Sequence, residues 1–173
     1  MKFKIVGGIK MSVEFLRIDD RIIHGQVVTR WAMEYPCDGL IAVNDKCALD
    51  PLLKTVLKAA SQKKTFVFTL KEFEEKKDKI VQSDKKYFLI TKNPIDMAKI
   101  LVDIDIKTNI DSVNVGPQSA RDNTTNINNN ADITKEEAEA YEKIHQKGYK
   151  VDFRLVPDAK SILWTSVRNK FTK

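Results

Sequence analysis

Short apolar segments alternate with longer amphipathic segments along most of the chain. The apolar segments have the length of strands, and the amphipathic ones space their apolar residues as helices do. About five such pairs follow one another, an order typical of a parallel sheet covered by helices. The fold class we expect is α/β: an open, mostly parallel β-sheet with helices on both faces, in a single domain. Strands are expected at 13–18, 39–44, 64–70, 85–91, 109–116 and 149–157.

Helix start and stop signals mark the segments between these strands. Asp50 and Asn93 each precede a proline, as capping residues do. Thr134 has a glutamate three residues later, which predicts a capping box, and Gly148 is a candidate for the helix end. The Asn-rich stretch 117–132 predicts a surface excursion with at most a short strand. Helices are expected at 25–35, 50–60, 71–82, 93–103 and 133–148, and a short helix or partly ordered tail at 161–171.

Composition is typical of a globular domain and argues against several classes of protein. The chain is 42% hydrophobic and 31% charged, as ordinary globular domains are, and none of its apolar runs approaches the length of a membrane span. The net charge of +6 permits an acidic partner, but lysines alternate with acids and no basic stripe carries interleaved aromatics, so we expect no nucleic acid. Cys37 and Cys47 lack the spacing of a metal or redox pair. We expect residues 1–11 to be an N-terminal extension and 12–173 the domain.

Polar residues gather where the predicted strands end, which is where parallel sheets bind ligands. The densest group lies in "RIDDRIIHGQVVTRW" (17–31), directly after the first strand. A strand that only fills a core has no need of such a charged end, because burying these groups costs desolvation. The candidate residues at these strand ends are Asp19, Asp20, Arg21, His24, Asp45, Thr91, Asn93, Asn114 and Gly116.

His24 immediately precedes a predicted helix. The first backbone amides of that helix, those of Gly25, Gln26 and Val27, lack helical acceptors and favour an anion. Arg21 can close on an oxyanion, and a neutral imidazole is a good nucleophile toward phosphorus. Asp19 or Asp20 can hydrogen-bond the other ring nitrogen. The sequence therefore allows a phosphohistidine.

A plainer interpretation stays open at this point, in which His24 caps or packs and Arg21 pairs with Asp20 on the surface. Elsewhere we expect His145 to be an ordinary residue of a charged helix. We expect Trp31 to be a packing residue and Arg30 to be a partner contact or a solvated charge.

The same segment resembles the active-site signature of the IIB subunits of the bacterial phosphotransferase system, in the mannose, fructose and sorbose family. There the pattern runs R-[IV]-D-[DS]-R-[LI]-[IL]-H-G-Q-V, followed by a tryptophan. The acidic loop "NDKCALD", the turn "TKNP" and "NVG" agree in order. The likeness extends from Ser12 to about Pro157.

The resemblance implies a phosphoryl carrier, an enzyme of the protein-phosphohistidine–sugar phosphotransferase type. His24 matches the phosphorylated residue, Arg21 the arginine that stabilises the phosphate, and Asp19 the acid beside it. The partners implied are a phospho-IIA domain, the IIC and IID membrane subunits, and a sugar. Neither metal nor cofactor is implied, because the donor is already an activated phosphoramidate. The implied location is cytoplasmic, peripherally associated with the inner face of the membrane through IIC and IID.

Three features depart from the family pattern. Pro117 and Gln118 stand where a second glycine and a methionine are common, Lys46 and Cys47 replace small or acidic residues, and the segment before Met11 lies outside the pattern. The alternatives are a receiver-like domain phosphorylated on aspartate, which the ending "FTLKE" of the third strand opposes, and a non-catalytic regulatory relative.

Overall fold

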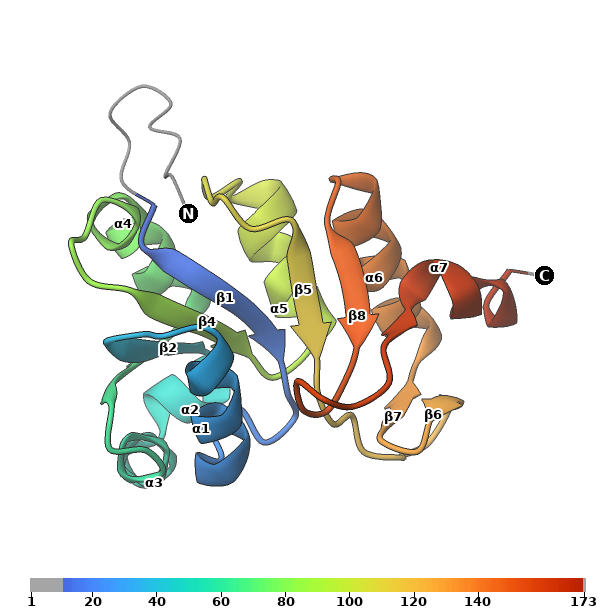
Figure 1. The fold of residues 1–173 in the computed structure, drawn as a ribbon, viewed down its shortest axis with the longest axis horizontal. Coiled ribbons are helices and arrows are strands. Elements are labelled where there is room, and N and C mark those ends of the chain that lie inside the picture. The colour runs from blue at the N-terminus through green and yellow to red at the C-terminus, as the bar shows by residue number, and fades with distance from the viewer. Residues whose placement is uncertain (1–10, 173) are drawn as a thin grey trace.

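The computed structural model describes residues 11–172, including the backbone but not the side chains of Gln26 and Val27, so the expectation for 1–10 lies outside the described residues. Within this range seven strands form one sheet in the order β3-β2-β4-β1-β5-β8-β9. Neighbouring strands are parallel except for β8 and β9 (Figure 1). The strands are β1 (Val13–Ile18), β2 (Gly39–Val43), β3 (Lys64–Phe68), β4 (Tyr87–Thr91), β5 (Ser112–Val115), β8 (Lys150–Phe153) and β9 (Ile162–Leu163).

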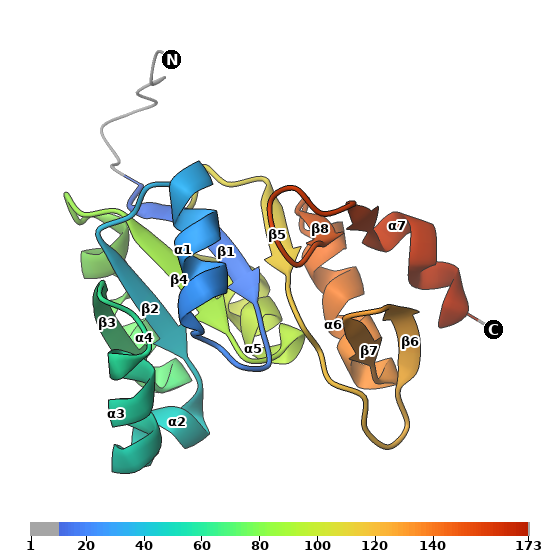
Figure 2. The ribbon, with the colours of Figure 1, turned by 60° about the horizontal axis from the view of Figure 1, so that its bottom comes forward.

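Helices cover both faces of this sheet, so the expected fold class is confirmed (Figure 2). The apolar core on one face includes Trp31 and Leu57 from α1 and α3. The core on the other face includes Phe73 and Tyr141 from α4 and α6. The helices are α1 (Gly25–Glu34), α2 (Asp45–Leu49), α3 (Pro51–Ala59), α4 (Leu70–Val81), α5 (Pro94–Ala98) with a π-helical turn (Lys99–Asp103), α6 (Lys135–Gln146), and α7 (Trp164–Val167) with a 3-10 turn (Arg168–Lys170).

The predicted start and stop signals are confirmed. The Asp50 side chain accepts hydrogen bonds from the first amides of α3, and Asn93 accepts one at the start of α5. Thr134 and Glu137 form the capping box of α6. Gly148 has a φ of +108°, the left-handed conformation that glycine adopts just beyond a helix end.

Several short elements were not predicted. The segment after β2, expected as a loop, forms the five-residue helix α2, which Asn44 caps through the amide of Cys47. The tail pairs with β8 as the two-residue strand β9 before α7 begins. The Asn-rich stretch contains an antiparallel hairpin of β6 (Thr125–Asn128) and β7 (Ala131–Ile133), close to the expected short strand. In residues 11–172 no helix is long and apolar enough to cross a membrane.

The register of the central strands sets the position of the polar residues. Arg17 of β1 lies opposite Asn114 of β5, and Ile18 lies between Thr91 and Val115. β1 therefore ends level with both neighbours, and the loop that follows it leaves the carboxyl edge of the sheet at its centre.

Candidate functional site

The loop between β1 and α1 has a strained backbone held by buried apolar side chains. Ile22 has a φ of +61°, a conformation in which a β-branched residue is a clear outlier. The amide of Ile22 donates to the carbonyl of Asp19 at 2.8 Å, which closes a turn. The side chains of Ile22 and Ile23 are both buried in the core beneath α1. Strain of this kind persists only where the surroundings enforce it, so the loop has a defined shape.

A buried ion pair lies directly beneath this loop. Arg17 is 1% exposed, and its guanidinium donates to the Asp19 carboxylate at 2.9 Å and 3.2 Å. The same guanidinium donates to the side-chain oxygen of Asn114, whose amide in turn donates to the carbonyl of Arg154 at 2.8 Å. Burial lowers the pKa of Arg17, and the Asp19 carboxylate opposes that effect. The end of β1 is thus tied to β5 and β8.

Gly116 follows β5 beside this ion pair. A Cβ at that position would stand 2.7 Å from Cζ of Arg17 and 3.0 Å from the Asp19 carboxylate, closer than side chains approach one another. The glycine of "NVG" therefore leaves room for the guanidinium, while Asn114 accepts its hydrogen bond. Both strand-end residues act on Arg17, and no described contact joins either one to His24.

Trp31 connects this buried network to the rest of α1. Its ring lies 5.9 Å from the Arg17 guanidinium carbon and 5.5 Å from that of Arg154, distances typical of cation–π contacts. The indole nitrogen donates to the carbonyl of Leu155 at 3.1 Å. The expected packing role of Trp31 is confirmed, since the residue is buried and stacks on Phe15.

Arg21 differs from Arg17 in its surroundings. Its side chain is 50% exposed, and its Nε lies 3.9 Å from the Asp19 carboxylate, while its backbone amide donates to that carboxylate at 3.0 Å. The alternative pairing of Arg21 with Asp20 is wrong. Asp20 instead accepts hydrogen bonds from the amide and hydroxyl of Ser119, because the loop after β5 runs beside it. The Arg21 guanidinium thus remains available at the surface.

His24 is the N-cap residue of α1, and its side chain makes no capping hydrogen bond. The imidazole is half-buried, and its Nε2 is buried without a hydrogen-bond partner. Burial lowers the pKa of His24, and the charge of Arg21 lowers it further, against the raising effect of Asp19. The ring is therefore held toward its neutral form, in which a nitrogen lone pair is free to attack.

The orienting hydrogen bond expected from Asp19 or Asp20 to the His24 ring is not formed among the described residues, and Asp20 accepts from Ser119 instead. Both oxygens of Asp19 already accept from Arg17 and from the amide of Arg21. Asp19 therefore acts on the imidazole through its charge and through the position of the loop.

The expected amide cradle follows from the start of α1. The first helical hydrogen bond runs from the amide of Val28 to the carbonyl of His24 at 3.1 Å. The amides of Gly25, Gln26 and Val27 precede that bond, so they have no acceptor inside the helix. They lie next to the imidazole in the chain and favour an anion there.

Two predicted strand-end residues serve other purposes. The Asp45 carboxylate accepts from the amide of Leu70 at 2.7 Å and so fixes the start of α4. Asn93 caps α5, as expected, and its carbonyl accepts from the hydroxyl of Thr91. Neither side chain contacts His24 in the described structure. Within residues 11–172 no three histidine, cysteine or acidic side chains gather closely enough to hold a metal ion.

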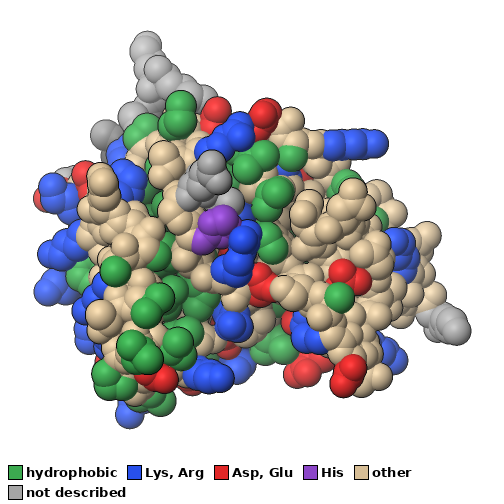
Figure 3. All heavy atoms as spheres, turned by 90° about the horizontal axis from the view of Figure 1, so that it is seen from below, with side chains coloured by type: hydrophobic (Ala, Val, Ile, Leu, Met, Phe, Trp, Pro, Cys, Tyr) green, Lys and Arg blue, Asp and Glu red, His purple; other side chains and the backbone are tan. Residues whose placement is uncertain are grey.

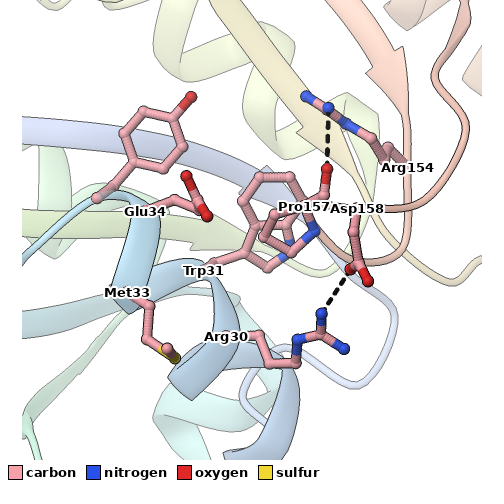
Figure 4. Close-up of a pocket in the computed structure, with 8 residues that line it drawn as sticks. Arg30, Trp31, Met33, Glu34, Arg154, Pro157 and Asp158 are labelled. Carbon is pink, nitrogen blue, oxygen red and sulfur yellow. Dashed lines mark hydrogen bonds and ion pairs between the residues drawn. The ribbon is translucent and has the colours of Figure 1, made fainter.

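A cavity of about 320 Å³ lies at the opposite end of α1 from His24 (Figure 4). Arg30 and Asp158 form an exposed ion pair across it, and Arg154 donates to the carbonyl of Pro157. Arg30, expected as a partner contact or a solvated charge, is therefore paired within the chain. The cavity connects α1 with the loop after β8.

Sequence reasoning missed Arg17 as a member of the site. The available signal was a lone arginine in the apolar run "VEFLRI", two residues before an aspartate. In a strand, that spacing places both side chains toward the same face. The other half of the signal, Asn114, lies 97 positions away in the chain.

Comparison with known proteins shows which family the chain belongs to. Residues 13–173 match the model of the family described as "PTS system sorbose subfamily IIB component". The chain belongs to this family. The match places the chain among IIB components of the phosphotransferase system (PTS) and not among receiver domains.

Relatives of this family cover most of the chain. The fructose-specific EIIB component of Bacillus subtilis is 28% identical over 94% of this chain and 99% of that protein. The sorbose-specific EIIB component of Lacticaseibacillus casei is 30% identical over 84% and 88%. The mannose-specific EIIAB component of Escherichia coli K12 is 34% identical over 84% of this chain but 45% of its own length, so the chain spans about half of that relative.

Solved structures have the same fold. The crystal structure of manxB from Thermoanaerobacter tengcongensis superposes with a TM-score of 0.83 at 26% identity, over 96% of this chain and all 100% of that one. The IIBSor domain of the sorbose permease from Klebsiella pneumoniae gives a TM-score of 0.81 at 24% identity, over 94% and 99%. At 24% identity, the similarity to the IIBSor domain shows a shared fold.

Proposed function

We propose that this chain carries a phosphoryl group on His24 within a sugar-transporting phosphotransferase system. In this role it accepts phosphate from a phosphohistidine of a IIA domain and passes it to a sugar held by the IIC and IID membrane subunits. The observation that carries the proposal is the His24 imidazole, which is partly buried, held toward its neutral form and next to the first free amides of α1.

In the forward step the phosphorus–nitrogen bond of the donor breaks while a new one forms to a lone pair of the His24 ring. The ring proton of His24 is released, and the donor imidazole that leaves takes up a proton. Both bonds are phosphoramidates of similar energy, so the chain's task is to position the groups and stabilise charge. The step requires no metal or nucleotide.

The residues around His24 have separate parts in this proposal. Arg21, which is half-exposed with its Nε 3.9 Å from the Asp19 carboxylate, stabilises the phosphoryl oxygens together with the amides of Gly25–Val27. Arg17 and Asp19 fix the loop from below. Because the chain must meet two partners in turn, an exposed loop suits the task better than a closed cleft.

The enzymatic role and location follow from the same scheme. The chain is proposed to act as a protein-phosphohistidine–sugar phosphotransferase at the cytoplasmic face of the membrane, reached through IIC and IID. Its relatives are named for mannose, fructose and sorbose. We propose that the membrane subunits, and not this chain, select the sugar.

Labelling with radioactive phosphoenolpyruvate tests the proposal. The chain is incubated with the general phosphotransferase proteins and a mannose-type IIA domain, and the label is then mapped. We expect one acid-labile, base-stable label on His24 that disappears in His24→Ala, with His145→Ala as the control that keeps it. Label on Asp19 or Asp20, or label that persists in His24→Ala, overturns the assignment. A chain that takes no label supports the regulatory alternative.

A further inference from the structure

The loop after β5 (116–121) holds the loop after β1 (19–24) through Asp20. The amide of Asp20 donates to the carbonyl of Pro117 at 3.0 Å. In return the amide of Ser119 donates to the Asp20 carboxylate at 2.8 Å, and the Ser119 hydroxyl donates to the same oxygen. The other oxygen of that carboxylate is buried without a hydrogen-bond partner in the part of the chain that the structure describes. The Asp20 carboxylate therefore depends on Ser119. We call these three hydrogen bonds the Asp20 clamp.

Asp20 lies inside the strained turn that leads to His24. The hydrogen bond from the amide of Ile22 to the carbonyl of Asp19 makes Asp20 and Arg21 the two central residues of this turn. The amides of Arg21 and Ile22 both return to Asp19, whereas Asp20 is tied to the loop after β5. The positive φ of Ile22 persists only where the surroundings enforce it. The Asp20 clamp is one of the contacts that enforce it.

The loop after β5 is itself anchored on the β6–β7 hairpin. Gln118 is 2% exposed, and its backbone amide donates to the carbonyl of Asn130 at 2.9 Å. Its carbonyl accepts from the amide of Asp132, also at 2.9 Å. Pro117 has a fixed φ, which limits where the carbonyl that accepts from Asp20 can lie. The two residues that depart from the family pattern after Gly116 thus both support the Asp20 clamp.

Arg121 holds Ser119 from the other side. Its guanidinium donates to the carbonyl of Ser119 at 2.9 Å and to the carboxylate of Glu137. Glu137 is 6% exposed and belongs to the capping box that begins α6. Ser119 is therefore exposed at the surface but fixed between α6 and Asp20.

We propose that Ser119 is a positioning residue for phosphoryl transfer at His24. This inference rests on the proposed function, because it explains how the site of that function is held. Ser119 does not touch the transferred group in this scheme. It holds Asp20, and Asp20 sets the turn from which the Arg21 guanidinium reaches the phosphoryl oxygens. Figure 3 shows this carboxyl edge from below, with a histidine side chain and basic side chains together at the surface. Small displacements of such groups slow a transfer that depends on position.

The test begins with Ser119→Ala, which removes the hydroxyl and keeps the backbone amide. We expect kcat for transfer from phospho-IIA to fall about fivefold or more, while the KM for phospho-IIA stays within about twofold. Ser119→Thr keeps a hydroxyl and should restore the wild-type kcat. Ser166→Ala is the matched control, because Ser166 is exposed and its hydroxyl donates to the carbonyl of Leu163 at the start of α7. Denaturant unfolding should show that all four proteins are folded under the assay conditions.

Phosphoramidate, a small phosphoryl donor, separates positioning from contact with the donor protein. We expect Ser119→Ala to slow the labelling of His24 by phosphoramidate as well, because the defect lies in the acceptor. A loss seen with phospho-IIA alone would mean that Ser119 contacts the donor, and it overturns the positioning role. A wild-type kcat in Ser119→Ala, or a Ser119→Thr as slow as Ser119→Ala, overturns it too. If wild-type His24 accepts phosphate from neither donor, the proposed function itself has failed.

A double-mutant cycle with Asp20→Ala shows whether Ser119 acts through Asp20. Because Asp20→Ala removes the acceptor, adding Ser119→Ala should then leave kcat unchanged. An equal loss of kcat from Ser119→Ala in both backgrounds would show that the hydroxyl acts elsewhere, and the Asp20 clamp would lose its role in transfer.

Discussion

Arg17 and Arg21 stand two residues before and two residues after the same aspartate, yet they differ in almost every physical respect. Arg17 is buried at the end of β1 and shares its guanidinium between Asp19, Asn114 and the face of Trp31. Arg21 is half-exposed, with a long contact of 3.9 Å to Asp19. The comparison shows that the Asp19 carboxylate holds the buried Arg17 with one oxygen and the backbone of the loop before His24 with the other. Stability and transfer should therefore respond to different substitutions.

Removal of the Asp19 carboxylate should have the largest effect on the free energy of unfolding. Asp19→Ala leaves the buried Arg17 charge without its partner, which we expect to cost about 3–5 kcal/mol of unfolding free energy. Denaturant unfolding measures this cost. Asp158→Ala is the control, since it removes the exposed partner of Arg30 and should leave the midpoint unchanged. Equal midpoints for both variants would show that the buried pair contributes no more than a surface pair.

A methyl group on Gly116 should have the next largest effect. Gly116→Ala directs a Cβ at the Arg17 guanidinium, and overpacking of this kind costs about 1–3 kcal/mol. A double-mutant cycle with Arg17→Met locates the clash, because Gly116→Ala should cost less once the guanidinium is gone. Strict additivity of the two substitutions would mean that Gly116 is needed for some other reason.

Replacement of Arg21, the exposed arginine, should affect function and leave stability nearly unchanged. We expect Arg21→Ala to alter the unfolding free energy by less than about 0.5 kcal/mol. Transfer from phospho-IIA to His24 should slow on the order of tenfold or more, because a charged donor to the phosphoryl oxygens is lost. Quench-flow labelling measures the rate, with Arg30→Ala as the control. Wild-type rates in Arg21→Ala would remove Arg21 from the site.

The smallest expected effect concerns pH. Protonation of His24 removes its lone pair, so the transfer rate should fall as pH drops through the pKa of the ring. Burial and Arg21 both lower that pKa, and loss of the Arg21 charge should raise it. The acid limb of the rate profile should therefore move to higher pH in Arg21→Ala. A ring titration by NMR, with signals assigned through His145→Gln, checks the direction, and a shift to lower pH would contradict it.

The sequence predicted those parts of the fold that local signals determine. The strand 13–18 and the helices that begin at Pro51 and Lys135 have apolar patterns and caps within a few residues of one another. The helix α2 and the strand β9 were not predicted. The helix α2 has five residues, and its local cap at Asn44 was a signal that the sequence analysis did not use. The strand β9 has two residues and depends on pairing with β8.

The site divides in the same way. His24 and Arg21 could be predicted as site residues because one continuous motif contains them, together with the start of the helix. The role of Arg17 could not be read from that motif. Its hydrogen bond to Asn114 and the space left by Gly116 exist only once β1 and β5 lie side by side. The pairing of Asp20 with Ser119 was missed for the same reason.

The position of Trp31 makes its intrinsic fluorescence a probe of the site. The indole lies against both Arg17 and Arg154, and Arg17 is joined to Asp19 beneath the loop that leads to His24. The other tryptophan, Trp164, donates to Glu142 near the C-terminal end and can be replaced by phenylalanine. If His24 carries phosphate as proposed, the fluorescence of the remaining ring should report each transfer in real time, without a dye or a radioactive label.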